Sequence, residues 1–235
     1  MPRLIIAATL TVSIIGAPLA WQEDKVVPVH QEPRHRLVFD SPGTRILDIQ
    51  IPPGDTTLFH THSDPILYVT MGTSTTRSQN FGEDWPAPRP QPQPNPGATA
   101  PTPARLGRMM STTTYGAKPY THRVNNIGQT VFRLIGVTNT SAGDASTTPS
   151  ADFDATPELT NNWFRGYRWA LTSAARNHRH ANPVAVVLVT GRAVAGTTAL
   201  DQPGSFAWIE ANTLHSLHAA EGAAEVVEIE VRRPH

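Results

Sequence analysis

Two pairs of histidines are the features of this sequence best suited to chemistry. His60 and His62 are separated by one residue, as are His178 and His180. Side chains two positions apart on a β-strand point to the same face of the sheet. If each pair lies on a strand, it therefore presents two imidazoles to one ion.

A third histidine follows each pair and could come from a facing strand, His122 in the first half and His215 in the second. Three neutral imidazoles suit zinc, copper, iron or nickel and leave coordination positions open for water or substrate. The sequence predicts a divalent metal ion (Fe, Mn, Zn, Ni or Cu) with these ligands: His60, His62, His122, His178, His180 and His215. The alternative is that the histidines form hydrogen bonds in the core, or contact a sugar, without a metal.

The segments that would position the first histidine set have strand character. Residues 44–51 alternate, with Leu47, Ile49 and Ile51 on one face, which predicts a half-buried strand. Further strands are expected in short runs rich in β-branched and aromatic residues, separated by turn residues. These runs are residues 57–62, 66–71, 109–115, 120–125 and 131–137.

The second half repeats this order, which argues for duplication. A strand at residues 167–172 precedes the histidine pair, an apolar run at 184–189 follows it, and a lone histidine comes before a final strand at 225–232. That final strand places Val227, Ile229 and Val231 on one face and Glu228, Glu230 and Arg232 on the other. We therefore predict an all-β chain of two tandem antiparallel barrels.

Composition changes mark the expected boundaries between these parts. A Pro-rich stretch at residues 85–105 has almost nothing to bury, and we interpret it as an insertion within the first barrel. Residues 139–160 are rich in Ser, Thr, Ala, Asp and Gly and are expected to form a linker. The first barrel is placed at 30–138 and the second at 161–235.

These stretches resemble the two motifs of the cupin superfamily. The first motif is similar to Gly54, His60, His62 and Gly72, the second to Gly116, Pro119, His122 and Asn126, and the second half matches at His178, His180, Gly191, Gly204 and His215. The resemblance implies a two-domain cupin, or bicupin, with jelly-roll-like barrels and one three-histidine metal site in each.

The sequence departs from the cupin pattern where a fourth ligand is expected. Cupins commonly carry a Glu a few residues after the histidine pair, whereas this chain has Asp64-Pro65-Ile66 in the first half and Asn182-Pro183-Val184 in the second. Asp64 is a possible additional ligand, and a role in a turn is equally compatible with its neighbours. Three-histidine cupins, which include several dioxygenases, are the closer comparison.

Other residues give weaker indications of a site. Arg176 lies two residues before His178, so on a strand it would point to the same face as the second histidine pair. It could bind a substrate carboxylate, although a surface salt bridge is the better interpretation. Tyr120 is a second candidate for contact with substrate. An aromatic group is expected to pack between the domains, namely Trp163, Phe164, Tyr167 and Trp169. Two early histidines, His30 and His35, are expected to face solvent or the domain boundary.

Composition restricts the partners and the compartment. The 19 basic and 19 acidic residues balance, which argues against nucleic acid as a partner. Residues 1–20 contain Arg3 and then an apolar run, the order of a secretory signal peptide, and the run is shorter than the roughly 20 residues of a membrane span. We expect a secreted or periplasmic protein without stable membrane anchoring. Because the chain has no cysteine, any metal ligands must be histidines and carboxylates.

Together these features favour a metal-dependent oxidoreductase of dioxygenase type that acts on a small molecule. Two alternatives stay open at this point. One is a small-molecule or sugar-binding protein without catalysis, and the other is a metal-dependent isomerase or lyase, because fold does not fix reaction. A homodimer is a possible assembly, since exposed barrel strands can pair between subunits.

Overall fold

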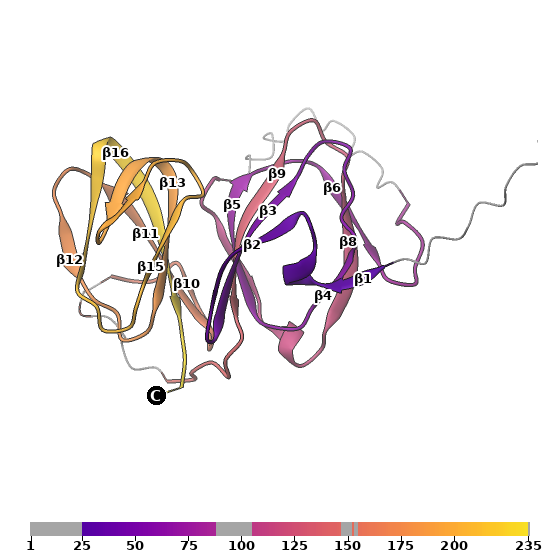
Figure 1. Cartoon of the computed structure of the whole chain (residues 1–235), viewed down its shortest axis with the longest axis horizontal. Coiled ribbons are helices and arrows are strands. Elements are labelled where there is room, and N and C mark those ends of the chain that lie inside the picture. The colour runs from indigo at the N-terminus through magenta and orange to yellow at the C-terminus, as the bar shows by residue number, and fades with distance from the viewer. Residues whose placement is uncertain (1–24, 88–104, 147–151, 153–154, 235) are drawn as a thin grey trace, which may run out of the picture.

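The computed structural model describes residues 25–87, 105–146, 152 and 155–234, and nearly all of its regular structure is β-strand (Figure 1). The chain folds into two units that lie side by side, which we call the N-terminal unit (β1 to β9) and the C-terminal unit (β10 to β16). The predicted all-β fold with antiparallel, jelly-roll-like sheets is confirmed. In the described residues, no helix is long and apolar enough to cross a membrane.

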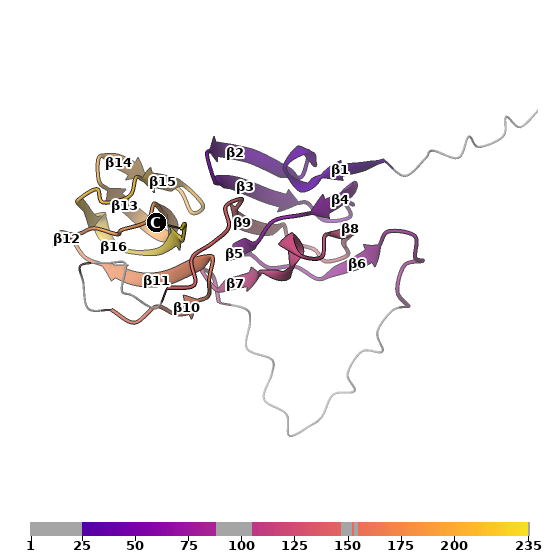
Figure 2. The same cartoon turned by 90° about the horizontal axis from the view of Figure 1, so that it is seen from below.

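The N-terminal unit consists of two sheets that face each other (Figure 2). One has the order β2-β3-β9-β5-β7 and the other β1-β4-β8-β6. The strands are β1 Val26–Pro28, β2 His35–Ser41, β3 Thr44–Ile51, β4 Phe59–His62, β5 Ile66–Gly72, β6 Thr76–Asn80, β7 Met109–Thr112, β8 Tyr120–Asn126 and β9 Phe132–Asn139, with short 3-10 helices at Val29–Gln31 (η1) and Thr114–Gly116 (η2).

Alternate residues of the first sheet point into the N-terminal unit. Leu47, Ile49 and Ile51 of β3 pack with Ile66 and Leu134 in a buried cluster. A polar contact also joins the two sheets. The fully buried Asn126 of β8 donates hydrogen bonds from Nδ2 to the carbonyl oxygens of Ile51 and Thr130. This frame holds β4 and β8, the strands that carry the first histidine set, against the apolar core.

The C-terminal unit is one strongly curved sheet with the order β10-β11-β16-β13-β14, to which β12 and β15 add at β16 and β13. Its strands are β10 Leu159–Thr160, β11 Phe164–Leu171, β12 Arg176–His178, β13 Val184–Ala195, β14 Thr198–Leu200, β15 Phe206–Ile209 and β16 His215–Val231. The pairing of β13 with β16 contains register shifts, and such bulges bend a sheet. The curvature allows one sheet to enclose its own core.

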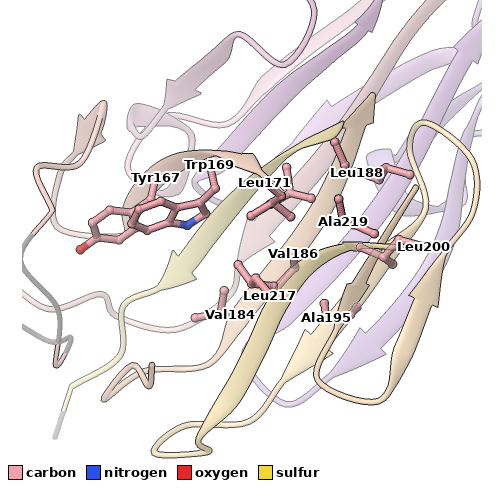
Figure 3. Close-up of a cluster of buried hydrophobic side chains, with 14 residues drawn as sticks. Tyr167, Trp169, Leu171, Val184, Val186, Leu188, Ala195, Leu200, Leu217 and Ala219 are labelled. Carbon is pink, nitrogen blue, oxygen red and sulfur yellow. The ribbon is translucent and has the colours of Figure 1, made fainter. Parts of the chain in front are cut away.

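The core of the C-terminal unit is aliphatic at one end and aromatic at the other. In Figure 3 the side chains of Leu171, Val186 and Leu217 gather with other aliphatic residues, while the rings of Tyr167 and Trp169 lie beside one another. The two rings are nearly parallel, with centroids 6.3 Å apart. The aromatic end borders the second histidine set, as described below.

The two units pack together through the faces of their sheets that point away from their own cores. Ile46, Leu67 and Val137 of the N-terminal unit share one buried cluster with Phe164 and Ile229 of the C-terminal unit. The prediction that residues 44–51 form a half-buried strand is therefore wrong, because Ile46 is fully buried on the outer face as well. The C-terminal unit covers that face, which periodicity within one strand could not reveal.

Segment boundaries follow the predicted order with a few differences. β1 begins before the expected start of the first barrel, and β10 falls within the expected linker. Tyr115, which ends the predicted strand at 109–115, lies instead in η2. The proposed signal peptide at 1–20 and most of the Pro-rich stretch lie outside the described residues.

Replacing Phe164 by Ala is expected to destabilise the protein by roughly 3–5 kcal/mol, because a large side chain is removed from the core between the units. Denaturant unfolding measures this change. Ile127→Ala removes an exposed side chain and serves as a control that should stay within about 0.5 kcal/mol of the parent. A Phe164→Ala variant as stable as this control would contradict the interface described here.

Candidate metal centres

Pairing of β4 with β8 assembles the first histidine set, which we call the N-terminal cluster: His60, His62 and His122. His60 lies opposite His122 in the antiparallel register. One nitrogen from each of the three rings lies within 4.8 Å of the others. The structure thus brings together the three residues that the sequence predicted as one ligand set.

Hydrogen bonds at the outer edge of the N-terminal cluster orient its rings. The Nδ1–H of His60 donates to the carbonyl oxygen of Leu58 at 2.9 Å, and Nδ1 of His122 lies 2.8 Å from the hydroxyl of Ser78. A ring fixed through Nδ1 presents the lone pair of Nε2, which is the usual arrangement of a metal-binding histidine. The Nε2 atom of His60 is buried and has no hydrogen-bond partner.

The spacing of the nitrogens fits a shared ion. Nε2 of His62 and Nε2 of His122 are 3.1 Å apart. Two nitrogens at the usual distance from one transition-metal ion are separated by about 3.0–3.4 Å when they are adjacent ligands. A cation between the rings would give the buried Nε2 of His60 a partner and would fit this separation, which is also that of a hydrogen bond. The residues present therefore fit a divalent metal.

The rings of the N-terminal cluster are neutral at physiological pH. Burial, with a smaller effect from neighbouring imidazoles, lowers the pKa of His60 to about 2, of His62 to about 3 and of His122 to about 4. Metal binding requires the unprotonated ring. The unit therefore holds the three rings in the form that can bind an ion.

Two tyrosines form a wall beside the N-terminal cluster. The ring of Tyr115 stacks on His62 at 4.9 Å, and the ring of Tyr120 lies 4.6 Å from that of His122. The Tyr120 hydroxyl donates to Asn80 Oδ1 at 2.7 Å. Tyr120 is therefore adjacent to the cluster, and its contact with substrate stays a prediction.

The second set, which we call the C-terminal cluster, contains a carboxylate as well as three histidines. His178, His180, His215 and Glu228 each contribute one atom to a group lying within 4.8 Å. His178 of β12 pairs directly with His215 of β16, and Glu228 comes from the far end of β16. Glu228 was not predicted as a site residue.

Glu228 is the acceptor at the centre of the C-terminal cluster. Nε2 of His178 and Nε2 of His215 both lie 3.0 Å from Glu228 Oε1, and the Nε1–H of Trp169 donates to Oε2 at 2.6 Å. His215 also donates from Nδ1 to the carbonyl oxygen of Thr213. Both nitrogens of His215 thus face acceptors, which requires a proton or another cation between Nε2 and the carboxylate.

The electrostatics of the C-terminal cluster differ from those of the N-terminal cluster. Burial alone would raise the pKa of Glu228, but hydrogen bonds from His178, His180 and His215 hold it well below its usual value. Burial lowers the pKa of His180, while interactions with Glu228 and Glu230 outweigh this and raise it to about 9. A carboxylate facing three imidazoles is a ligand set that suits a divalent transition metal.

The C-terminal cluster is enclosed. Its four members are all buried, Glu228 and Glu230 are fully inaccessible, and Asn182 donates to Glu230 Oε1 at 2.9 Å. The ring of Trp169 covers one side, and the exposed guanidinium of Arg176 lies over that ring at 4.2 Å. In contrast, His122 of the N-terminal cluster is half-buried and its partner Ser78 is exposed. Solvent therefore approaches the first cluster more closely than the second.

Several weaker predictions are revised by these positions. Asp64 is not part of the ligand group and instead accepts a hydrogen bond from Ser63 at 3.2 Å. Arg176 makes a cation–π contact with Trp169, and its binding of a substrate carboxylate stays a prediction. Of the aromatic group expected between the domains, Trp163 and Phe164 belong to the core between the units, whereas Tyr167 and Trp169 line the interior of the C-terminal unit.

The expectation that His35 faces solvent or the domain boundary is wrong. His35 is buried beside the N-terminal cluster, with its ring centroid 4.3 Å from that of His60. It is held there by Glu32, which is also buried. Nothing in the local sequence around residue 35 indicates this position, because it depends on how β2 folds over β4.

Glu228 was visible in the sequence only as one of two glutamates on the alternating final strand. Alternation of Glu with Val and Ile is typical of a strand with one face in water. Here the apolar face meets the other unit and the polar face points into the barrel. The carboxylate absent from the expected place after the histidine pair is thus supplied by another strand.

Metal-free protein is expected to lose stability as the pH falls below 6.5, and urea unfolding across this range measures the loss. The unfolded chain protonates its histidines near 6.5, whereas His60, His62 and His122 stay neutral down to about pH 2 to 4. His180 acts in the opposite sense, because its stabilising effect is complete below 6.5 and is lost as the pH rises through about 9. A His60→Leu/His62→Leu variant should lose less stability on acidification, and an unchanged slope would contradict this assignment.

Comparisons with known proteins identify the fold. No protein-family model and no curated protein matches the sequence. Among solved structures, AerE from Microcystis aeruginosa matches with a TM-score of 0.54 at 9% identity, over 82% of this chain and 90% of that one. The bacterial pirin YhhW from Escherichia coli, in complex with nickel(II), matches with a TM-score of 0.51 at 17% identity over 81% and 82%. Salicylate 1,2-dioxygenase from Pseudoaminobacter salicylatoxidans, in complex with gentisate, matches at 0.51 and 10% identity over 81% and 69%. At these identities the likeness concerns the fold, which this chain shares with all three proteins.

Proposed function

We propose that the chain is an exported bicupin that acts as a metal-dependent oxidoreductase of dioxygenase type on a small molecule, with the N-terminal cluster as its active centre. One observation carries the proposal. The buried and unpartnered Nε2 of His60 points to a ligand at a cluster of neutral imidazoles. Two proteins of the same fold support it, since one was crystallised with nickel(II) and the other is named a dioxygenase.

A divalent redox metal held by His60, His62 and His122 would supply the electron transfer and the positions for substrate and dioxygen. The chain itself orients the ligands through Leu58 and Ser78. Tyr115 and Tyr120 are parallel, with 6° between the ring planes and centroids 5.9 Å apart, and each ring lies against a histidine of the cluster. Aromatic rings at this position would favour a planar substrate by stacking.

We assign a structural role to the C-terminal cluster. Its ligands are enclosed by Trp169 and by the buried pair Asn182 and Glu230, which leaves no evident approach for a substrate among the described residues. A metal bound there would link β12 to both ends of β16. Binding that occurs only in the folded state stabilises that state.

The closed C-terminal cluster also favours a second candidate function, namely a protein that binds a small molecule and turns nothing over. In that case both metals would be structural. The two functions differ in whether the protein consumes oxygen, and the measurements below separate them.

Protein purified without a tag is expected to contain two divalent ions per chain by elemental analysis, one for each cluster. His60→Ala/His62→Ala and His178→Ala/His180→Ala should each remove one ion, because each double change deletes two ligands. His30→Ala, which lies outside both clusters, should leave the content unchanged. Metal-free parent protein that also fails to take up added Fe, Mn, Zn, Ni or Cu would refute metal binding.

Oxygen uptake with catechols, diketones and thiols is expected to require the N-terminal cluster and not the C-terminal one. His122→Ala should abolish uptake, whereas Glu228→Gln should leave it at the parent level while lowering the thermal stability of the metal-loaded protein. An oxygen electrode and a thermal melt report the two effects separately. Loaded protein that consumes no oxygen with any of these substrates would favour the binding function.

A further inference from the structure

A fourth histidine lies against the N-terminal cluster in the part of the chain that the structure describes. His35 begins β2 and is only 4% exposed. Its ring centroid is 4.3 Å from that of His60, which is closer than His60 lies to His62 (5.0 Å) or His122 (4.6 Å). The centroids of His35 and His62 are 6.3 Å apart. His35 therefore extends the group of rings on the side of His60.

A buried carboxylate fixes the ring of His35. Its Nδ1–H donates to Glu32 Oε2 at 2.6 Å, and Glu32 is 2% exposed. The same carboxylate accepts the backbone N–H groups of Arg34 at 2.7 Å and Leu58 at 3.1 Å. Because all of these donors hold Glu32 in place, it is poorly placed to turn toward the cluster. Because the bond to Glu32 occupies Nδ1 of His35, Nε2 is the nitrogen of this ring that can bind a metal ion.

His35 and His60 share one supporting network. Leu58 donates its N–H to Glu32 and accepts the Nδ1–H of His60 at its carbonyl oxygen. The outer nitrogens of both rings are thus linked through a single residue. An N–H of a ligating histidine bonded to a carboxylate or a backbone carbonyl is the common second layer of metal sites, where it sets the ring orientation and raises its basicity.

We propose that His35 is a fourth nitrogen ligand of the N-terminal cluster, oriented by Glu32, so that the first centre binds its metal through four histidines. The inference rests on the proposed function, because it concerns the same ion. His35 lies outside the group of three whose nitrogens are all within 4.8 Å, so metal binding would bring its Nε2 closer to the other rings while Nδ1 keeps its bond to Glu32. Four neutral imidazoles would not offset the positive charge of the bound ion, whereas the carboxylate of Glu228 would offset part of it in the C-terminal cluster.

Four nitrogen ligands favour copper, nickel, zinc or iron over manganese, which prefers oxygen. The carboxylate in the C-terminal cluster makes that site less selective against manganese. The two centres of one chain would then differ in the metal that they retain. The carboxylate that the first half lacks after its histidine pair is replaced, in this assignment, by an imidazole from β2.

Copper(II) bound to the full-length chain tests the proposal without reference to activity. A His178→Gln/His215→Gln background disables the C-terminal cluster, so that the signal comes from the first one. Electron paramagnetic resonance of copper(II) reports the number of bound nitrogens through their hyperfine splitting. We expect four nitrogens in this background and three after His35→Gln, together with a copper(II) affinity at least 10-fold weaker.

Glu32→Gln keeps the histidine and removes the charge of its partner, which typically weakens metal binding by about 10- to 100-fold. His30→Gln changes a half-buried histidine outside the cluster and should alter neither the affinity nor the nitrogen count. Three nitrogens in the background protein, or a count unaffected by His35→Gln, would overturn the proposal while leaving the three-histidine centre intact. Failure of the background protein to bind copper, nickel or zinc would refute the metal centre itself and His35 with it.

Discussion

The packing of the two units against each other is the constraint on which the rest of the structure depends. Each unit has a sheet with two apolar sets of side chains, one for its own core and one for its neighbour. Phe164 and Ile229 from one unit meet Ile46, Leu67 and Val137 from the other. The apolar face of β16 is removed from water at this contact between the units. The polar face of the strand can therefore point into its own unit.

Burial of polar groups without partners is costly, and the two clusters meet this cost in different ways. The N-terminal cluster contains neutral imidazoles with lowered pKa values, and its one described buried nitrogen without a partner is Nε2 of His60. The C-terminal cluster balances a carboxylate against surrounding imidazoles and Trp169. In the first arrangement the unpartnered nitrogen of His60 could bind a cation near solvent. In the second, which is closed, Glu228 accepts the hydrogen bonds of the groups around it.

This contrast explains why similar histidine spacings in the two halves need not have the same role. Access, charge and the identity of the fourth neighbour differ between them, Glu228 in one and His35 in the other. Neither residue is part of the motif spacing: His35 comes from β2, and Glu228 lies at the far end of β16, the strand that begins with His215. His35 is positioned by the packing of β2 near β4, and Glu228 by the curvature of β16, which returns its far end to the cluster.

The sequence by itself determined the class of the fold, the order of the strands and the grouping of six histidines into two sets of three. It could do so because strand periodicity and the one-residue separation within each pair are local, and His122 and His215 recur at similar places in the two halves. Only the tertiary structure decided that Ile46 is buried on its outer face, that Glu228 points inward and that His35 borders His60. Alternation along a strand distinguishes two faces but carries no information on what covers each face, and that depends on contacts between residues far apart in the chain.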